Sequence, residues 1–342
     1  MIKVTLKYIG ITIIIYVFIC LITPYFNFLK HRSIENQICW LSEIMDNGYD
    51  DTLQSKFPEG KLFSNSILAL STIQYCDKNK IYDFKYSAIV DSCISRIQSK
   101  RTRRIFNSDM SPKYGIFYNG WSNLVYSKYK KSQLFKYSNL KSSIKDVSKK
   151  IEERIYQTQT DSLRILDTYI GSNWPADNLI GISSINNDSL KQIWIEKLFE
   201  ETRHDSGLIH HTGSNERVIR GSSSAMMTYC LGLSDYSNIG KYNDLFHSIF
   251  IDEYLGVQLV KENEDASNSM DIDSGPVIFG YGASATIMNI KTQASLGNKK
   301  SKLTWAVMNT LGLSMNLFNK KYYLFKQEPM FDLFMLWGST EL

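Results

Sequence analysis

The hydrophobic positions of this chain follow, over most of its length, the spacing of amphipathic helices. The clearest pattern lies between residues 86 and 97, where apolar side chains recur at i, i+3, i+4 and i+7. A second long stripe covers residues 140–155 and carries Lys and Glu on its other faces. Further helices of this kind are predicted over residues 40–44, 63–73, 242–250 and 303–318.

Strand patterns are scarce, and polar loops rich in Gly, Asn, Asp or Ser separate the predicted helices. A short segment at residues 322–325 fits a strand and would form a hairpin at most. No Pro/Gly/Ser linker or long block of charge divides the chain, and no strict repeat indicates a solenoid. The pattern predicts one all-α domain of about eleven or twelve helices, paired around a centre.

An almost unbroken apolar run at residues 9–22 precedes these helices. Counted through Leu29, it approaches the roughly 20 residues that cross a bilayer. No small-residue cleavage site of a signal peptide is visible. Aromatic residues typical of a membrane interface follow the run: Tyr25, Phe26 and Phe28. We expect a transmembrane signal anchor over residues 1–32.

The domain that follows the anchor is expected over residues 33–342. Lysines before the run are nearly balanced by basic residues after it, and export of the C-terminal body is the orientation we favour. The domain would then lie outside the cytoplasm, in the periplasm or at the cell surface.

The composition limits the classes of partner and cofactor that we expect this chain to bind. The 342 residues are 43% hydrophobic and 21% charged, with a net charge of +5, which is ordinary for a globular protein. The densest basic run, residues 100–104, follows a helical pattern without a nucleic-acid-binding motif, so nucleic acid is not expected as a partner. The 5 cysteines lack metal-ligand or redox spacing, and we expect no metal and no cofactor.

The most distinctive loop contains Asp271 and Asp273 and runs on through Ser-Gly-Pro, which cannot continue a helix. Apolar and aromatic neighbours, including Tyr281, indicate a packed turn. Carboxylates on a stiff, half-buried loop suit proton transfer. The structural alternative is that either aspartate caps a helix or ties the turn together.

A third carboxylate, Asp177, follows Trp174 and Pro175 near a predicted helix start. Its charge would stabilise free amides there if it were a cap. The tryptophan and proline would instead bury the approach to a catalytic carboxylate held in a pocket. Both interpretations stay open.

Aromatic side chains recur in the loops and suit stacking on a sugar ring. Two aromatics, Phe117 and Tyr118, lie between Gly115 and Gly120, with Tyr114 before them and a tryptophan after them. Such rings provide flat surfaces with phenol and indole donors, although they would equally fill a core. The candidate substrate-binding aromatics are Tyr114, Tyr118, Trp121, Trp174 and Tyr281.

Two further loops contain polar residues that are candidates for substrate binding. His210 and His211 belong to a segment with three of the chain's five histidines, suited to hydrogen bonding or proton transfer rather than to one shared metal. Arg220 precedes a glycine and three serines at a predicted helix start, which suits a carboxylate, a phosphate or a polar ring substituent. Exposed loop histidines and a capping role for Ser222 are the structural alternatives. Neither a phosphate loop nor a nucleophile elbow is present.

Distinctive loops between helices give the chain a resemblance to the (α/α)6-toroid enzymes: glycoside hydrolases, polysaccharide lyases and the linalool dehydratase/isomerase type. It covers roughly residues 34–342, and loop segments 114–121, 174–177, 220–224 and 271–276 resemble those of uncharacterised membrane-anchored bacterial proteins of this shape. The resemblance implies an (α/α)6 toroid after one transmembrane helix. It supplies no catalytic set that maps onto this chain.

The sequence therefore favours a membrane-anchored enzyme that acts on a carbohydrate or glycan, by glycoside hydrolysis with paired carboxylates. Asp177 would be the base and Asp273 the acid, with Asp271 adjusting the pKa of Asp273. One alternative is a lyase or isomerase acting on an isoprenoid or lipid alcohol, with aromatic side chains shielding a carbocation. Another is a non-catalytic binding protein of the envelope.

Overall fold

The computed structural model describes residues 2–213, 217–270 and 274–342, and this part of the chain is mostly helical. Within it lie fifteen α-helices, three 3-10 helices and six short strands, which confirms the prediction of an all-α protein with an apolar N-terminal helix. The first eight α-helices are α1 (Ile2–Ile22), α2 (Asn27–Asp46), α3 (Tyr49–Lys56), α4 (Gly60–Asn79), α5 (Phe84–Ile97), α6 (Lys100–Arg103), α7 (Gly115–Lys131) and α8 (Lys141–Asp161). The others are α9 (Pro175–Ser184), α10 (Asp188–Thr202), α11 (Gly221–Leu233), α12 (Ile239–Phe250), α13 (Ala283–Ser295), α14 (Ser301–Leu311) and α15 (Pro329–Glu341).

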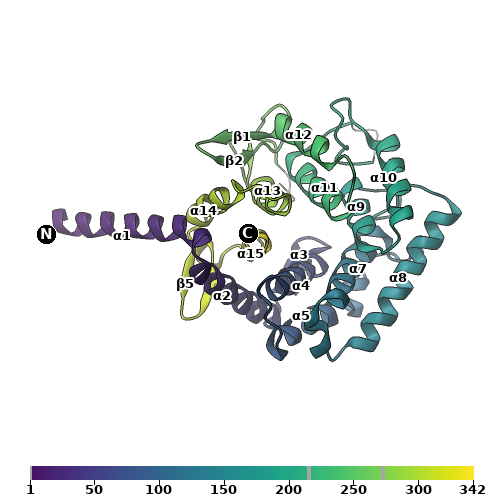
Figure 1. Cartoon of the computed structure of the whole chain (residues 1–342), viewed down its shortest axis with the longest axis horizontal. Helices are drawn as coiled ribbons and strands as arrows, with labels where there is room; N and C mark the ends of the chain where they lie inside the picture. Colours follow the sequence, from purple (N-terminus) through teal and green to yellow (C-terminus); the bar gives the residue numbers. More distant parts are fainter. Residues whose placement is uncertain (1, 214–216, 271–273) are drawn as a thin grey trace.

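Six of these helices pack one against the next in chain order. Helix α4 contacts α7, α7 contacts α9, and the sequence of contacts continues through α11 and α13 to α15, which returns to α4. Figure 1 shows these six helices around the middle of the molecule, with α5, α8, α10 and α12 on the outside. We call α4, α7, α9, α11, α13 and α15 the inner helices.

The periodic stripes of the sequence explain why the outer helices have one buried face. Helix α5 buries the side chains of the predicted stripe, among them Val90, Cys93 and Ile97, and Asp83 caps its first turn through the amide of Tyr86. Helix α8 likewise buries one apolar stripe and exposes its lysines. These helices therefore cover the inner helices on one side and face solvent on the other.

Glycines let two inner helices approach closely. A Cβ atom added to Gly120 of α7 would lie 2.9 Å from the backbone nitrogen of Gly181 in α9, which no real side chain tolerates. Beside this contact the inner helices bury large rings, with Trp121 against Phe63 and Trp337. Close backbone approach and aromatic packing thus fix α7 between α4 and α9.

A buried lysine joins the C-terminal halves of four inner helices. Lys291 of α13 pairs with Glu341 of α15 at 2.7 Å and hydrogen-bonds to Gln74 of α4. Its ammonium group also lies over the rings of Tyr229 and Trp337. Burial lowers the pKa of Lys291 to about 8 despite the Glu341 carboxylate.

The strands form three antiparallel hairpins at the surface. They are β1 (Ile251–Tyr254) with β2 (Val257–Val260), β3 (Val277–Ile278) with β4 (Tyr281–Gly282), and β5 (Met315–Leu317) with β6 (Lys320–Tyr322). The helix expected to run to residue 318 ends at Leu311, because Leu313 adopts a left-handed φ of 49° that turns the chain into β5. The hairpin predicted near residues 322–325 lies slightly earlier, over 315–322.

The N-terminal helix leads directly into the helical domain. Among the described residues, one helix is long and apolar enough to cross a membrane, over a window from Tyr8 to Tyr25 with a mean hydropathy of 2.1. Helix α2 begins at Asn27, so the expected boundary at residues 32/33 falls within a continuous helix.

A second buried lysine lies at the base of the β5–β6 hairpin. Lys321 is 1% exposed, and its ammonium group makes no hydrogen bond but lies over the rings of Trp305 and Tyr323. Burial lowers the pKa of Lys321 from 10.5 to about 7. Burial also raises the pKa of the nearby Asp332 carboxyl to about 8.

We predict that Lys321→Met stabilises the protein, most strongly at low pH. The folded state binds the lysine proton less tightly than the unfolded state, so the cost of burying the charge is fully present below pH 7 and is relieved as the pH rises toward 10.5. Thermal melts in detergent should show a higher midpoint for the variant at pH 6.5 and a smaller gain at pH 9.5.

The neighbouring exposed lysine is the matched control. Lys320→Met removes a surface pair with Glu43 and should change the free energy of unfolding by no more than about 1 kcal/mol at either pH. A destabilised Lys321→Met variant at pH 6.5 would contradict the interpretation that this ammonium group is an unfavourable burial.

Candidate functional site

The N-terminal ends of five inner helices are connected to one another through their preceding loops. Tyr169, in the loop before α9, donates a hydrogen bond to Glu59 at the start of α4. The amide of Ile116, at the start of α7, donates to the carbonyl of Asp167 at 2.9 Å. In the loop before α11, the amide of Gly213 donates to the carbonyl of Asn173 at 3.0 Å. At the start of α11, the amide of Gly221 donates to the carbonyl of Glu262 at 2.9 Å.

The same connections reach α13 through the segment after β2. The amide of Glu262 donates to the carbonyl of Gly280, which lies just before β4 and α13, at 3.0 Å. The described parts of the loops before α4, α7, α9, α11 and α13 therefore meet along one face of the molecule, the face where these inner helices begin. We call it the loop face.

Asp177 lies at the start of α9 on this face. Pro175 begins the helix and Trp174, not Asp177, occupies the N-cap position. Asp177 is half-buried, and its Oδ2 accepts a hydrogen bond of 2.6 Å from Thr168 Oγ1. Asn178 fixes the loop before it through reciprocal hydrogen bonds with the backbone of Leu166. A carboxylate is thus held in a defined position in the first turn of α9, near the positive end of the helix dipole.

A buried ion pair lies at the start of α11. Arg220 Nη2 lies 3.1 Å from Glu262 Oε1, and their side chains are 10% and 0% exposed. Ser222 Oγ donates to the same carboxylate oxygen at 2.7 Å. A Cβ atom on Gly221 would lie 1.9 Å from the Lys261 carbonyl oxygen, so glycine is needed for the two segments to approach.

His211 belongs to the same cluster. Arg220 Nη1 donates to His211 Nε2 at 3.4 Å, and His211 Nδ1 lies 2.5 Å from Ser223 Oγ. Because a guanidinium group can only donate, Nε2 is the acceptor, which places the ring proton on Nδ1 and directs it to the serine. Arg220 therefore orients both a carboxylate and an imidazole.

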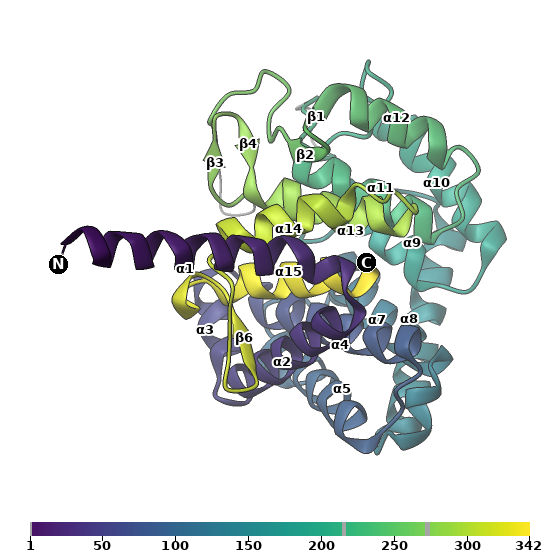
Figure 2. The same cartoon turned by 60° about the vertical axis from the view of Figure 1, so that its left-hand side comes forward.

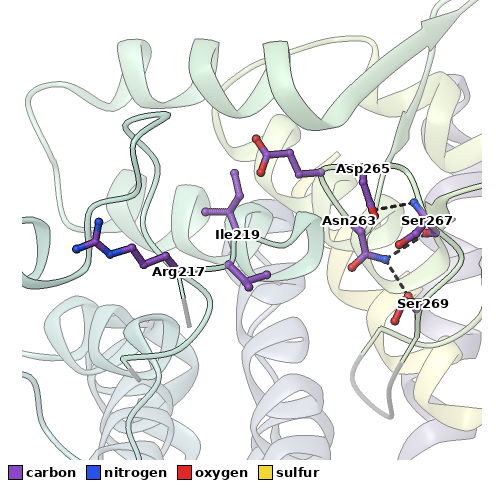
Figure 3. A pocket seen from close by; sticks show the side chains of 8 residues that line it. Arg217, Ile219, Asn263, Asp265, Ser267 and Ser269 are labelled. Atoms are coloured by element: carbon purple, nitrogen blue, oxygen red, sulfur yellow. Dashed lines mark hydrogen bonds between the residues drawn. The ribbon is translucent and has the colours of Figure 1, made fainter. Parts of the chain in front are cut away.

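An open cavity of about 600 Å³ adjoins this cluster (Figure 3). Two segments line it, one ending in Ile219 just before Arg220 and the other starting at Asn263 just after Glu262. Polar side chains dominate the lining: Arg217, Asn263, Glu264, Asp265, Ser267 and Ser269, with Val218 and Ile219 as the apolar members.

The second lining segment is stiffened by its own hydrogen bonds. Asn263 Nδ2 donates to the carbonyl oxygens of Ser267 and Ser269 at 3.2 and 2.9 Å. The amide of Ser267 donates to Asp265 Oδ1 at 3.0 Å and lowers the pKa of that carboxyl. Asp265 is therefore an ionised group on a defined turn beside the cavity.

The structure separates the predicted aromatic platform into core and surface residues. Tyr118 and Trp121 are buried, and burial raises the pKa of Tyr118 to about 12. Tyr114 is partly exposed and packs edge-on against Tyr118, whereas Trp174 packs edge-on against Tyr169. Tyr118 and Trp121 thus serve the core, which was the structural alternative for this loop.

The remaining predicted residues lie in different surroundings. His210 is buried, and burial together with the charges of His204 and Arg217 lowers its pKa. The hydroxyl group of Tyr281 donates to Asp252 at 2.9 Å and lies 2.9 Å from the hydroxyl group of Tyr254. The predicted catalytic residues Asp271 and Asp273 lie outside the described residues.

Glu262 and Thr168 were not predicted from the sequence. In the sequence, Glu262 is one of several acids in a polar segment. Every second residue of β2 is buried, namely Gln258 and Val260, and Glu262 is the next residue in this alternation. That alternation was the available signal. Thr168 had none, because its partner Asp177 becomes its neighbour only when the loop folds back onto α9.

Comparison with known proteins does not identify the chain. No model of a protein family matches it, and a search of curated proteins finds no similar sequence. A function has to be inferred from the residues of the chain itself.

We predict that Glu262→Ala destabilises the fold far more than substitution of a neighbouring acid. Its removal leaves the Arg220 guanidinium buried without this carboxylate, which costs about 3–5 kcal/mol in such pairs. Denaturant unfolding followed by tryptophan fluorescence measures the loss. The control is Glu264→Ala, an exposed acid two residues away, expected to change stability by about 0.5 kcal/mol or less. Equal effects of the two substitutions would contradict a structural ion pair at the start of α11.

Proposed function

We propose that this protein is a membrane-anchored enzyme that acts on a carbohydrate or glycan, by glycoside hydrolysis that uses carboxyl groups on the loop face. The observation that carries the proposal is the open polar cavity beside the buried Arg220–Glu262 pair. Polar, hydrogen-bonding walls suit a substrate rich in hydroxyl groups. They suit an isoprenoid or lipid alcohol poorly, and we therefore favour the hydrolase over the dehydratase-like alternative.

The proposed architecture is an (α/α)6 toroid. The circuit of contacts from α4 through α15 and back to α4 supports it, as does the alternation of inner helices with α5, α8, α10, α12 and α14 along the chain. In such an arrangement the loops before the inner helices gather at one end of the ring. The hydrogen bonds that join the starts of α4, α7, α9, α11 and α13 agree with this.

The proposed role of Asp177 follows from its surroundings. Asp177, held by Thr168 in the first turn of α9, is the proposed base that activates water. Asp273, which lies outside the described residues, keeps the role of acid that the sequence favours, and Asp271 keeps that of adjusting its pKa. The exposed Arg217 contacts polar substituents at the cavity, while Arg220, buried behind it, orients His211 for the same purpose.

Helix α1 is the proposed membrane anchor. Its apolar window from Tyr8 to Tyr25 is only 17% buried against the rest of the chain, unlike a helix of a soluble core. In this proposal the helical domain lies outside the cytoplasm, where a glycan substrate is accessible.

The decisive variant is Asp177→Asn. An asparagine oxygen still accepts the Thr168 hydrogen bond, so the melting temperature should stay within about 2 °C of that of the parent protein. The rate at which reducing ends are released from a panel of soluble oligosaccharides, including peptidoglycan, chitin and xylan fragments, should fall about 10²- to 10⁴-fold.

Asp188→Asn is the matched control, since Asp188 also lies in the first turn of a helix, α10, but is exposed. It should retain full activity. Unchanged turnover of Asp177→Asn would show that Asp177 is not the catalytic base, and loss of its folding would make the aspartate a structural residue.

A further inference from the structure

The apolar part of α1 is just long enough to cross a bilayer. The window from Tyr8 to Tyr25 contains 18 residues, which as a helix extend about 27 Å, against a hydrocarbon thickness of about 30 Å. In the sequence, Lys7 precedes this window and Lys30 follows it closely. A crossing therefore needs nearly all of the window, since the charged residues at its ends remain outside the hydrocarbon.

The second half of this window lies alongside the helical domain. Helix α1 packs against α14, and Tyr16 donates a hydrogen bond of 3.2 Å to the carbonyl of Thr310 near the end of α14. Cys20 is buried by this contact, whereas Phe18 and Ile19 on the opposite face are exposed. The end of α14 therefore lies level with the middle of the proposed membrane span.

The edge of the domain at this level exposes apolar side chains. Leu311 at the end of α14 is 66% exposed, and Phe318 at the tip of the β5–β6 hairpin is 94% exposed. Leu313, Leu317 and Phe325 are exposed as well. Figure 2 shows this hairpin extending from beside α1 along α2, on the side of the domain from which the N-terminal half of α1 projects, and Figure 1 places β5 on the same side.

The hairpin is rigid and its tip is strained. Phe318 and Asn319 have φ values of 51° and 60°, a conformation that suits glycine or asparagine and costs a phenylalanine about 1 kcal/mol or more. Its strands are fixed to α2 by a hydrogen bond of 2.6 Å between Asn36 and Asn316 and by a pair between Lys320 and Glu43. It is the group of exposed apolar side chains along this edge, and not one phenylalanine alone, that indicates an external partner.

We propose that the edge formed by Leu311, Leu313, Leu317, Phe318 and Phe325 enters the bilayer that α1 crosses, beside the C-terminal half of α1. The domain would then lie directly on the membrane rather than on a free tether. This inference depends on the proposed anchoring by α1 but not on the proposed catalysis.

The test uses the full chain in nanodiscs of phosphatidylcholine and phosphatidylglycerol, which leave both membrane faces accessible. Single cysteines carrying an environment-sensitive fluorophore are introduced in a Cys39→Ser background, because the other four native cysteines are buried. The variants are Phe318→Cys at the hairpin tip, Ile13→Cys in α1, and Ile193→Cys on α10, an exposed position on the far side of the domain.

We expect nitroxide-labelled lipids to quench the probes at positions 318 and 13. We also expect iodide to quench these two probes at least threefold less than it quenches the probe at position 193. Shielding at position 13 with full iodide access at position 318 would overturn the docking of this edge while leaving the anchor intact. Iodide access at both positions would overturn the anchoring as well. The activity of Asp177→Asn does not enter this test, so a failure of the proposed catalysis is recognised separately.

Discussion

The return of α15 to α4 is the constraint on which the rest of this structure depends. An inner helix can bury apolar side chains on several sides only if a neighbour covers each of them, and the circuit of contacts from α4 to α15 supplies those neighbours. The contact of Gly120 with Gly181 brings α7 and α9 together. Lys291 ties α13 to α4 and α15 at the other end, through Gln74 and Glu341. Local helix propensity alone would not close this arrangement.

This packing also determines where polar chemistry can be placed. The C-terminal halves of α4, α11, α13 and α15 meet at Lys291 and the rings of Tyr229 and Trp337, whereas the N-terminal ends of the inner helices are joined by loops that hydrogen-bond to one another. Free amides and positive dipole ends favour acidic groups near helix starts. Asp177 at the start of α9 and Glu262 beside the start of α11 fit that rule. A polar site on the loop face is thus a consequence of the helix arrangement.

The sequence predicts the helices well because their buried stripes repeat every three to four residues, as in α5 and α8. It also places Asp177 and Arg220 at helix starts, because they stand beside Pro and Gly signals, and their roles in a site stay predictions. It does not distinguish Trp121, a core residue, from Trp174, a partly exposed one, because aromatic residues serve both purposes. The pairing of Arg220 with Glu262 joins residues 42 positions apart in the chain (262 minus 220) and depends on tertiary contacts that no local pattern encodes.

The central claim is that substrate binds on the loop face. Amide hydrogen exchange of the full chain in nanodiscs, with and without the oligosaccharide that binds most tightly among those tested for hydrolysis, measures this directly. The account predicts slower exchange in residues 167–177, 217–220 and 262–269, with no change in the loops that follow the inner helices, such as residues 185–187 and 234–238. Protection confined to those latter loops, or no binding to any oligosaccharide at millimolar concentration, would contradict it.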